Sequence, residues 1–175
     1  MVAAAIDSSG ASKSFDVAHL REAFRRVAAT VHVIGVKLSD GRFFATTATA
    51  VTSVAFDPPT LLVCLNRSTV IAEAILQADI FTVSTLTASQ KHIAAACAGQ
   101  MEHEKREAYF TLSPRLNAPL LIDAQAAFVC RRTQSATCGT HSIVWGETVE
   151  ASSKPAVEPL LYLNGQYGAF QPAPT

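Results

Sequence analysis

The sequence predicts a mainly β protein, a small barrel with helices at its periphery, and three observations support this fold class. First, about seven runs rich in β-branched and aromatic residues recur along the chain. Second, the Asp-Gly pair at residues 40–41 is a strong signal for a tight hairpin. Third, only three segments have a helical pattern, at residues 16–29, 70–78 and 87–99. Because antiparallel hairpins dominate, the strands are expected to close into a barrel.

The first half of the chain supplies a helix and a hairpin. Residues 1–14 are expected to form a flexible tail, and residues 15–175 a single domain. The helix at 16–29 is predicted because Val17, Leu20, Phe24 and Val27 share one face and Asp16 can cap its start. A strand over residues 30–38 then leads through the Asp-Gly turn to a returning strand over residues 46–56. That strand ends at Asp57-Pro58-Pro59, since proline donates no ladder hydrogen bond.

The second half alternates strands with short helices. Residues 60–65 are continuously apolar, which predicts a strand buried on both faces. The helix at 87–99 begins with a capping box of Thr87 and Gln90 and ends at Gly99. Polar residues 100–119 are expected to form a loop. The other predicted strands span residues 80–86, 125–133, 141–151 and 159–165.

Composition limits the function classes. Hydrophobic residues make up 49% of the 175 residues and charged residues only 16%, and mean hydropathy is +0.24. Such a chain hides more apolar surface than one core needs, so part of that surface is expected in a subunit interface. The 14 basic and 14 acidic residues cancel without a basic stripe, so no nucleic-acid partner is expected. No apolar run is long enough for a membrane helix, and no export signal or metal-ligand spacing is visible. With no export signal, a reducing cytoplasm is the expected location, and the four cysteines contain no C-x-x-C pair.

The run of small residues at 46–56 is the first candidate site. Its side chains are nearly all Thr, Ala, Val or Ser, and neither face is strongly apolar or charged. Small side chains would let a flat heteroaromatic ligand lie against the backbone, with hydroxyls bonding its polar edge. The alternative is a small-residue strand packed inside a tight barrel, and composition alone favours that alternative.

The segment "NRST" at residues 66–69 is the second candidate site, because it lies where a buried strand leads into a helix. A helix N-terminus offers free N–H groups and the positive end of the helix dipole. Arg67 adds a guanidinium fork that suits phosphate. Alternatively, Ser68 or Thr69 caps the helix and Arg67 is a solvated surface residue. Beside the small-residue strand, however, the segment favours a nucleotide-like cofactor.

Several segments together resemble the short-chain flavin reductases, the reductase components of two-component flavin-dependent monooxygenases. The signature of that family is similar to "ATTATAVTSVAFDPPTLLVCLNRST" at residues 45–69. Further similarity follows in the same order along the chain and covers roughly residues 18–171. Its segments are "FRRVAATVHVIGV", "ASQKHIAAACAGQ", "GTHSIVWGETVEA" and "PLLYLNGQYGAF".

The resemblance implies a split β-barrel of the FMN-binding type that works as a homodimer, with the flavin near the interface. It implies hydride transfer from NADH or NADPH to FMN or FAD, followed by release of reduced flavin to a partner monooxygenase. The expected nicotinamide-side residue is His141, and residues 66–69 would hold the ribityl chain and phosphate. The expected cofactor-binding residues are Thr47, Ala48, Thr49, Ala50, Val51, Thr52, Ser53, Asn66, Arg67, Ser68, Thr69, Gly99 and Gln100.

Two other functions stay open at this point. One is a reductase on the same barrel whose reduced flavin acts on a cobalt corrinoid or a ferric chelate. The other is a flavin-binding or storage module without enzymatic activity. NAD(P)H consumption with added free flavin distinguishes the second from an enzyme.

Overall fold

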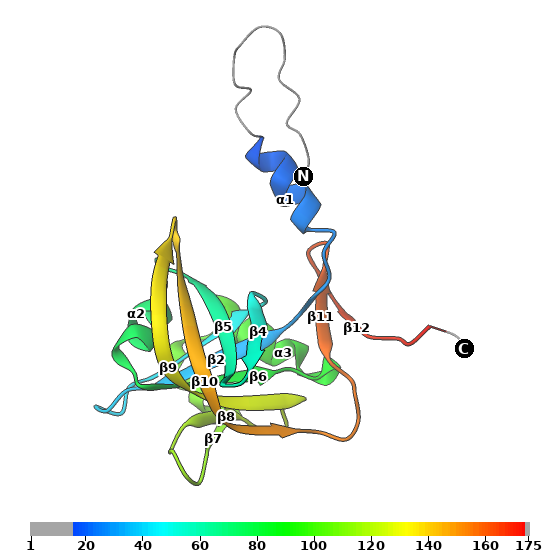
Figure 1. Ribbon diagram of the computed structural model, residues 1–175. Helices are drawn as coiled ribbons and strands as arrows, with labels where there is room; N and C mark the ends of the chain where they lie inside the picture. Colours follow the sequence, from blue (N-terminus) through cyan, green and yellow to red (C-terminus); the bar gives the residue numbers. More distant parts are fainter. Residues whose placement is uncertain (1–15, 174–175) are drawn as a thin grey trace, which may run out of the picture.

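The computed structural model describes residues 16–173, and its main feature is a seven-stranded antiparallel sheet in the order β3-β2-β6-β9-β10-β5-β4 (Figure 1). The strands are β2 (His32–Lys37), β3 (Phe43–Ala48), β4 (Val51–Phe56), β5 (Pro59–Asn66), β6 (Ile80–Thr85), β9 (Ala126–Cys138) and β10 (His141–Ser153). The predicted tail lies outside the described residues, as do residues 15, 174 and 175, so the predicted domain bounds stay predictions.

Two small sheets and several short helices surround this barrel. The small sheets consist of β1 (Ala29–Thr30), β11 (Leu160–Leu163) and β12 (Gln166–Ala169), and of β7 (Phe110–Leu112) and β8 (Pro119–Leu121). The helical segments are α1 (Val17–Phe24), α2 (Val70–Gln77), η1 (Ala88–Gln90), α3 (Lys91–Ala95), η2 (Ala96–Gln100), α4 (His103–Arg106) and η3 (Glu107–Tyr109). The predicted fold class, mainly β with peripheral helices, is confirmed. Within residues 16–173, no helix has the length and apolarity needed to span a membrane.

The prediction of one continuous strand over residues 46–56 is wrong, because the chain changes partners at Thr49 and Ala50. β3 pairs with β2 at one edge of the sheet, and β4 pairs with β5 at the other. Three Cα steps, at most about 11 Å, join the end of β3 to the start of β4, so the sheet must curl to bring its edges together there. No ladder joins β3 to β4 within the described part of the chain. The barrel is therefore split along this line.

The core has two parts, one on each side of the curled sheet. One cluster packs α2 residues such as Ile71 and Ile75 against Val63, Phe81 and Val144. The other includes Val31, Val33, Leu86, Ile93 and Leu160, and so joins the barrel to α3 and the small sheets. The strand predicted at 60–65 was expected to be buried on both faces. Only Leu61, Val63 and Leu65 are buried in the protomer, while Leu62 and Cys64 are half-buried.

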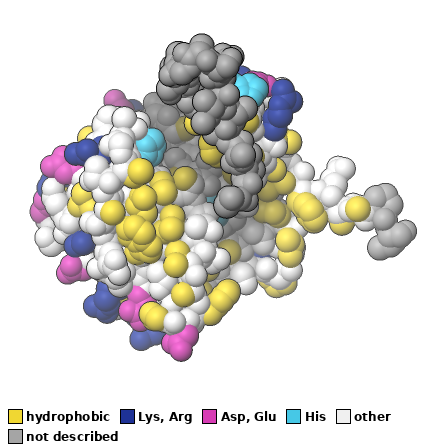
Figure 2. Space-filling view, turned by 45° about the horizontal axis from the view of Figure 1, so that its top comes forward, with side chains coloured by type: hydrophobic (Ala, Val, Ile, Leu, Met, Phe, Trp, Pro, Cys, Tyr) yellow, Lys and Arg dark blue, Asp and Glu magenta, His cyan; other side chains and the backbone are white. Residues whose placement is uncertain are grey.

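The first helix is shorter than predicted and leaves its apolar face uncovered. Asp16 caps its start through a 2.8 Å bond to the Ala18 N–H, but α1 ends at Phe24 rather than at residue 29. No α1 residue is buried, and Phe24 is 67% exposed. Figure 1 shows α1 standing away from the barrel, and Figure 2, with that end turned forward, shows hydrophobic side chains at this end of the molecule. The amphipathic pattern therefore marks a surface that residues 16–173 do not cover.

Three further boundaries differ from the predictions. The strand expected at 30–38 is interrupted at Val31, whose backbone bonds to Leu160 and Leu86 outside the barrel. The loop expected at 100–119 contains α4, η3 and β7. The last strand turns back at Asn164 and Gly165, both with positive φ, to form β12. An Asn-Gly pair favours such a tight turn, so this hairpin had a signal in the sequence.

Candidate functional site

The small-residue segment passes through the gap between β3 and β4. The Thr47 hydroxyl donates a 2.7 Å hydrogen bond to the Ala94 carbonyl of α3, so this side chain fixes the strand in place. Ala48 and Val51 are half-buried, whereas Thr49 and Ala50 are exposed. Thr52 and Ser53 are also exposed on β4. The segment thus presents small side chains and accessible backbone at the point where the barrel is split.

The turn of residues 66–69 is built by its own polar groups. The Asn66 Oδ1 accepts bonds of 3.0 Å from both the backbone N–H and the hydroxyl of Ser68. The Thr69 hydroxyl donates 2.7 Å to the Asn66 carbonyl, so Thr69 precedes α2 without its side chain capping the helix. Within residues 16–173, no side chain caps the start of α2, which leaves backbone N–H groups there for an anion.

The start of β10 brings His141 next to this turn. His141 pairs with Asn66 across the β5–β10 ladder, and the Arg67 N–H donates 3.0 Å to the Thr140 carbonyl. The His141 side chain is exposed, and its Nδ1 lies 3.0 Å from the Thr140 hydroxyl. The turn and His141 therefore form one rigid corner of the barrel.

A cleft of about 920 Å³ connects this corner with the small-residue segment. His141 and Thr140 line one part of it, and Thr49 and Ala50 line another. The remaining walls come from the β11–β12 hairpin and from α1 and the residues after it, which contribute apolar side chains together with Arg21 and Arg25. A smaller hollow of about 150 Å³ beside it is lined by Val31, Thr47, Ala48, Thr49, Tyr162 and Tyr167. The two hollows share Thr49 and Tyr162.

Gly99 and Gln100 belong to the π-helical stretch η2, which packs against β3. Gly99 has φ 110°, a conformation that favours glycine. Both residues are exposed but line neither hollow. Of the predicted site residues, Thr47, Ala48, Thr49, Ala50 and His141 line the two hollows, whereas residues 51–53, 66–69 and 99–100 line neither.

Several cleft residues were missed from the sequence. Tyr162 and Tyr167 face each other across the β11–β12 hairpin, with ring centroids 5.2 Å apart, and both line the smaller hollow. The Asn-Gly turn between them was the signal that could have placed both rings on one hairpin. Arg106 was also missed, and it contacts the carbonyl of Ala45 on β3.

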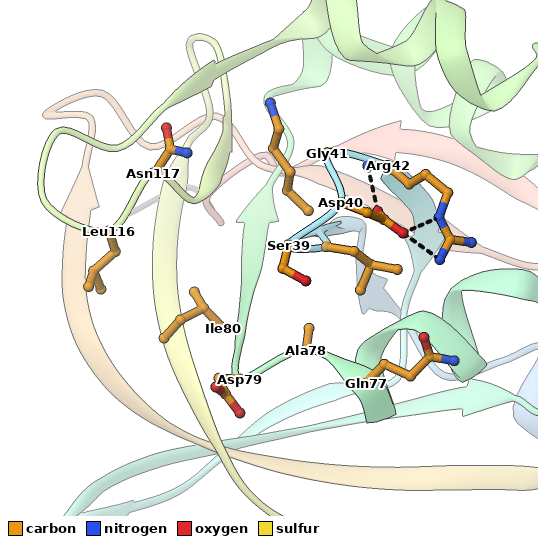
Figure 3. A pocket seen from close by; sticks show the side chains of 12 residues that line it. Ser39, Asp40, Gly41, Arg42, Gln77, Ala78, Asp79, Ile80, Leu116 and Asn117 are labelled. Carbon is orange, nitrogen blue, oxygen red and sulfur yellow. Dashed lines mark hydrogen bonds and ion pairs between the residues drawn. The ribbon is translucent and has the colours of Figure 1, made fainter.

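A separate hollow of about 570 Å³ lies between the β2–β3 hairpin, the end of α2 and the β7–β8 connection (Figure 3). Its two cationic side chains are already paired with carboxylates. Arg42 contacts Asp40 at 2.8 Å, and Lys37 lies 3.4 Å from Glu107. Since both cations are paired and Asp79 adds a further negative charge, this hollow is poorly suited to an anionic cofactor. Within the described residues, no group of three or more metal-ligating side chains is found.

His32 on β2 is half-buried and lines neither hollow. It pairs with Ala48 on β3, and its Nδ1 lies 3.1 Å from the Thr85 hydroxyl. Burial lowers the pKa of His32 from 6.5 to about 4, so the ring is neutral at pH 7. His103 is also half-buried, because its ring contacts Phe44 and Arg106.

The buried His32 makes stability depend on pH. The unfolded chain protonates His32 near pH 6.5, whereas the folded chain does so only near pH 4. The stability that depends on a neutral His32 is therefore fully present above pH 6.5 and is lost as the pH falls to about 4. We expect a loss of about 3 kcal/mol in the free energy of unfolding between pH 7 and pH 4 from this group. Urea unfolding of the wild type and His32→Gln at several pH values measures it. Parallel stability curves for the two proteins would contradict the assignment.

Comparison with known proteins identifies the family. The model of the flavin reductase like domain matches residues 24–171 of this chain. The chain belongs to this family. The reductase component of an FADH(2)-dependent resorcinol hydroxylase from Rhizobium sp. (strain MTP-10005) is 39% identical, over 89% of this chain and 88% of that protein. The FMN reductase (NADH) RutF of Variovorax paradoxus (strain S110) is 33% identical, over 91% of this chain and 88% of that protein.

A solved structure supports the same conclusion for this flavin reductase-like chain. The NADH:FAD oxidoreductase SgcE6 of Streptomyces globisporus C-1027, in complex with NAD and FAD fragments, superposes with a TM-score of 0.82. It is 29% identical and covers 90% of this chain and 94% of its own. The predicted family and split-barrel fold are therefore confirmed. The predicted enzyme class, flavin reductase, and the predicted cofactors, a flavin and NADH, agree with the names of these relatives.

Proposed function

We propose that this chain is an NAD(P)H:flavin oxidoreductase that reduces FMN or FAD by hydride transfer and releases the reduced flavin to a partner monooxygenase. The observation that carries the proposal is the convergence of three features at one split in the barrel. These are the small-residue segment, the uncapped start of α2, and His141 at the head of β10. The relative from Rhizobium, named as the reductase component of a hydroxylase, supports the partner enzyme.

The segment of residues 47–53 would bind the isoalloxazine ring. Thr49 and Ala50 expose backbone and small side chains to the cleft, so a flat ring can approach the chain closely. Exposed hydroxyls of Thr52 and Ser53 lie on the next strand. Bound flavin supplies the hydride-accepting chemistry, and fixed donors at its polar edge would stabilise the negative charge that develops there.

The turn of residues 66–69 would hold the ribityl chain and the phosphate. Asn66 and Thr69 shape the turn by internal bonds, so their neighbours keep fixed positions. The uncapped N–H groups at the start of α2 are suited to an anion, and the exposed Arg67 can add charge-assisted bonds. Gly99 and Gln100 would form a further wall beside β3.

His141 would orient the nicotinamide of NADH or NADPH over the flavin. It lies in the same cleft as Thr49 and Ala50 and is anchored by its ladder partner Asn66. Hydride transfer needs the two rings in contact and aligned, so the work of the protein is mainly to position them. The four cysteines are free thiols, which fits a cytoplasmic location for this reaction.

The active form would be a homodimer in which the uncovered face of α1 packs against a second copy. The exposed apolar residues that line the cleft are Val17, Leu20, Phe24 and Val27. Val54 and Phe56 on β4 are also exposed, Phe56 to 91%. Such a surface is typical of a subunit interface. The α1 face also lines the large cleft, so a second copy there would cover bound flavin.

Phe24→Asp is expected to convert the dimer to a monomer at micromolar concentration and to weaken flavin binding. A buried carboxylate in an apolar interface is costly, whereas in the protomer Phe24 is exposed and the fold should survive. Light scattering measures the mass, and flavin fluorescence the affinity. Val157→Asp is the control, because Val157 is equally exposed at 70% but lies in the connection between β10 and β11. A wild-type monomer, or a dimeric Phe24→Asp protein, would contradict this interface.

Release of reduced flavin can be tested without the partner enzyme. Under anaerobic conditions, the protein and NADH are placed on one side of a dialysis membrane and ferricytochrome c on the other, with FMN free to cross. Released reduced flavin should reduce cytochrome c on the far side faster than in a chamber without the protein. If flavin is reduced but the cytochrome stays oxidised, reduced flavin remains bound and the release step of this proposal is wrong.

A further inference from the structure

Arg106 is a buried cation whose side chain contacts only neutral groups. Its side chain lies on α4 and is only 5% exposed. Within residues 16–173 it forms no ion pair with a carboxylate. A buried charge is costly unless it is compensated. The hydrogen bonds of Arg106 provide this compensation, so they hold the surrounding segments in place.

Those bonds reach two segments that the sequence keeps far apart. The Arg106 Nη1 donates 2.7 Å to the carbonyl of Ala45 on β3, and Nε donates 2.8 Å to the carbonyl of Met101. Nη2 also donates to the Met101 carbonyl, and Nη1 lies 3.1 Å from the His103 Nδ1. The Arg106 guanidinium thus joins Met101 to β3, and β3 leads into the small-residue segment.

The position of Ala45 explains why a donor is needed there. β3 is an edge strand of the large sheet, and Ala45 is fully buried. A buried carbonyl on an edge strand needs a partner from outside the ladder, and Arg106 supplies it. Two residues further on, the Thr47 hydroxyl bonds the Ala94 carbonyl of α3. The helical segment from α3 to α4 is therefore tied to β3 at two points, one on each side of Thr46.

We propose that Arg106 is a positioning residue for flavin, which ties Met101 to Ala45 on β3 and thereby fixes the strand that leads into the small-residue segment. The inference rests on the proposed function, because it requires flavin to lie along the segment of residues 47–53. Arg106 itself is buried and lines neither hollow. Its loss should therefore weaken binding of any ligand that carries the isoalloxazine ring, whether or not the ligand carries a phosphate.

The test compares Arg106→Lys and Arg106→Met with a matched control, Arg132→Met. The guanidinium of Arg132 also bonds a backbone carbonyl, that of Ala78 at 3.0 Å. Ala78 lines the hollow of Figure 3, and Arg132 lines neither hollow of the candidate site. Lysine keeps the charge and can keep one of the two carbonyl contacts, whereas methionine loses both. The measurements are the affinity for FMN and for riboflavin, the KM for flavin, kcat and Tm.

For Arg106→Lys we expect flavin affinity to fall on the order of 10-fold, by the same factor for FMN and riboflavin. The KM for flavin should rise correspondingly, with kcat at saturating flavin within about threefold of wild type. The Arg106→Met protein should bind flavin more weakly than the Arg106→Lys protein, because lysine keeps one of the two carbonyl contacts. Arg132→Met should lower Tm without changing flavin affinity.

Each other outcome has a defined meaning. If Arg106→Met does not fold, the folded Arg106→Lys protein still decides the question. Wild-type flavin affinity in Arg106→Lys would overturn the positioning role and leave the proposed function intact. A loss for FMN but not for riboflavin would also overturn it, because Arg106 would then serve the phosphate. If the wild type binds no flavin at all, the proposed function fails and the inference fails with it.

Discussion

Arg67→Ala should weaken the binding of FMN and FAD by about 10- to 150-fold and leave riboflavin binding nearly unchanged. Arg67 is exposed in the turn before α2, and its backbone N–H is fixed by the Thr140 carbonyl 3.0 Å away. The turn should therefore keep its shape when the side chain is removed. What is lost is one charge-assisted bond to phosphate, which is worth about 1.5–3 kcal/mol. Riboflavin has no phosphate and should not be affected.

Salt dependence and a second arginine provide the controls for this experiment. Because Arg67 is exposed, salt should screen its contribution, and the difference between wild type and variant should shrink as ionic strength rises. Arg131→Ala removes an equally exposed arginine from β9, at a position that lines neither cleft hollow, and should bind all three flavins normally. An equal loss of affinity for riboflavin in Arg67→Ala would show that Arg67 supports the fold or the ring and not the phosphate.

His141→Ala should slow flavin reduction by NADH on the order of 10- to 100-fold in kcat/KM, with flavin affinity nearly unchanged. The side chain is exposed in the cleft, and within residues 16–173 it belongs to neither core cluster. Hydride transfer needs no proton at the nicotinamide carbon, so His141 is expected to orient the nucleotide rather than to act as a general acid or base. His141→Asn should then restore part of the rate, because asparagine can still form hydrogen bonds.

Stopped-flow reduction at saturating flavin measures this step directly. His92→Ala is the matched control, since His92 is also exposed but lies on α3, outside the large cleft. It should reduce flavin at the wild-type rate. A wild-type rate for His141→Ala at every NADH concentration would show that His141 is only the first residue of a strand.

Local patterns in the sequence predicted several elements and the class of cofactor. The capping box of Thr87 and Gln90 is present, with the Thr87 N–H bonded to the Gln90 Oε1 at 3.0 Å. Gly99 ends its helix with positive φ. The turn of residues 66–69 and the start of α2 also lie where the sequence placed them. Each of these features depends on residues close together in the chain, so the sequence carries the information directly.

Features that depend on distant partners were not predictable in the same way. β-Branched residues favour extended backbone on both sides of Thr49 and Ala50, so composition could not show that β3 and β4 pair with different strands. Arg106 looked like one more charge in a polar loop, because its role depends on the buried carbonyl of Ala45, 61 residues away. The α1 face could be seen in the sequence, but only the structure shows that the protomer leaves it uncovered.

The central claim is that this protein transfers hydride from a reduced nicotinamide to flavin. The most direct measurement is anaerobic mixing of NADH or NADPH with FMN, FAD or riboflavin, with and without the protein, while flavin absorbance and nicotinamide oxidation are followed together. The account predicts that catalytic amounts of protein bleach a large excess of flavin, with one nicotinamide oxidised for each flavin reduced. A protein that binds flavin in its cleft but leaves both rates at their protein-free values would contradict the account, and would identify a flavin-binding module without reductase activity.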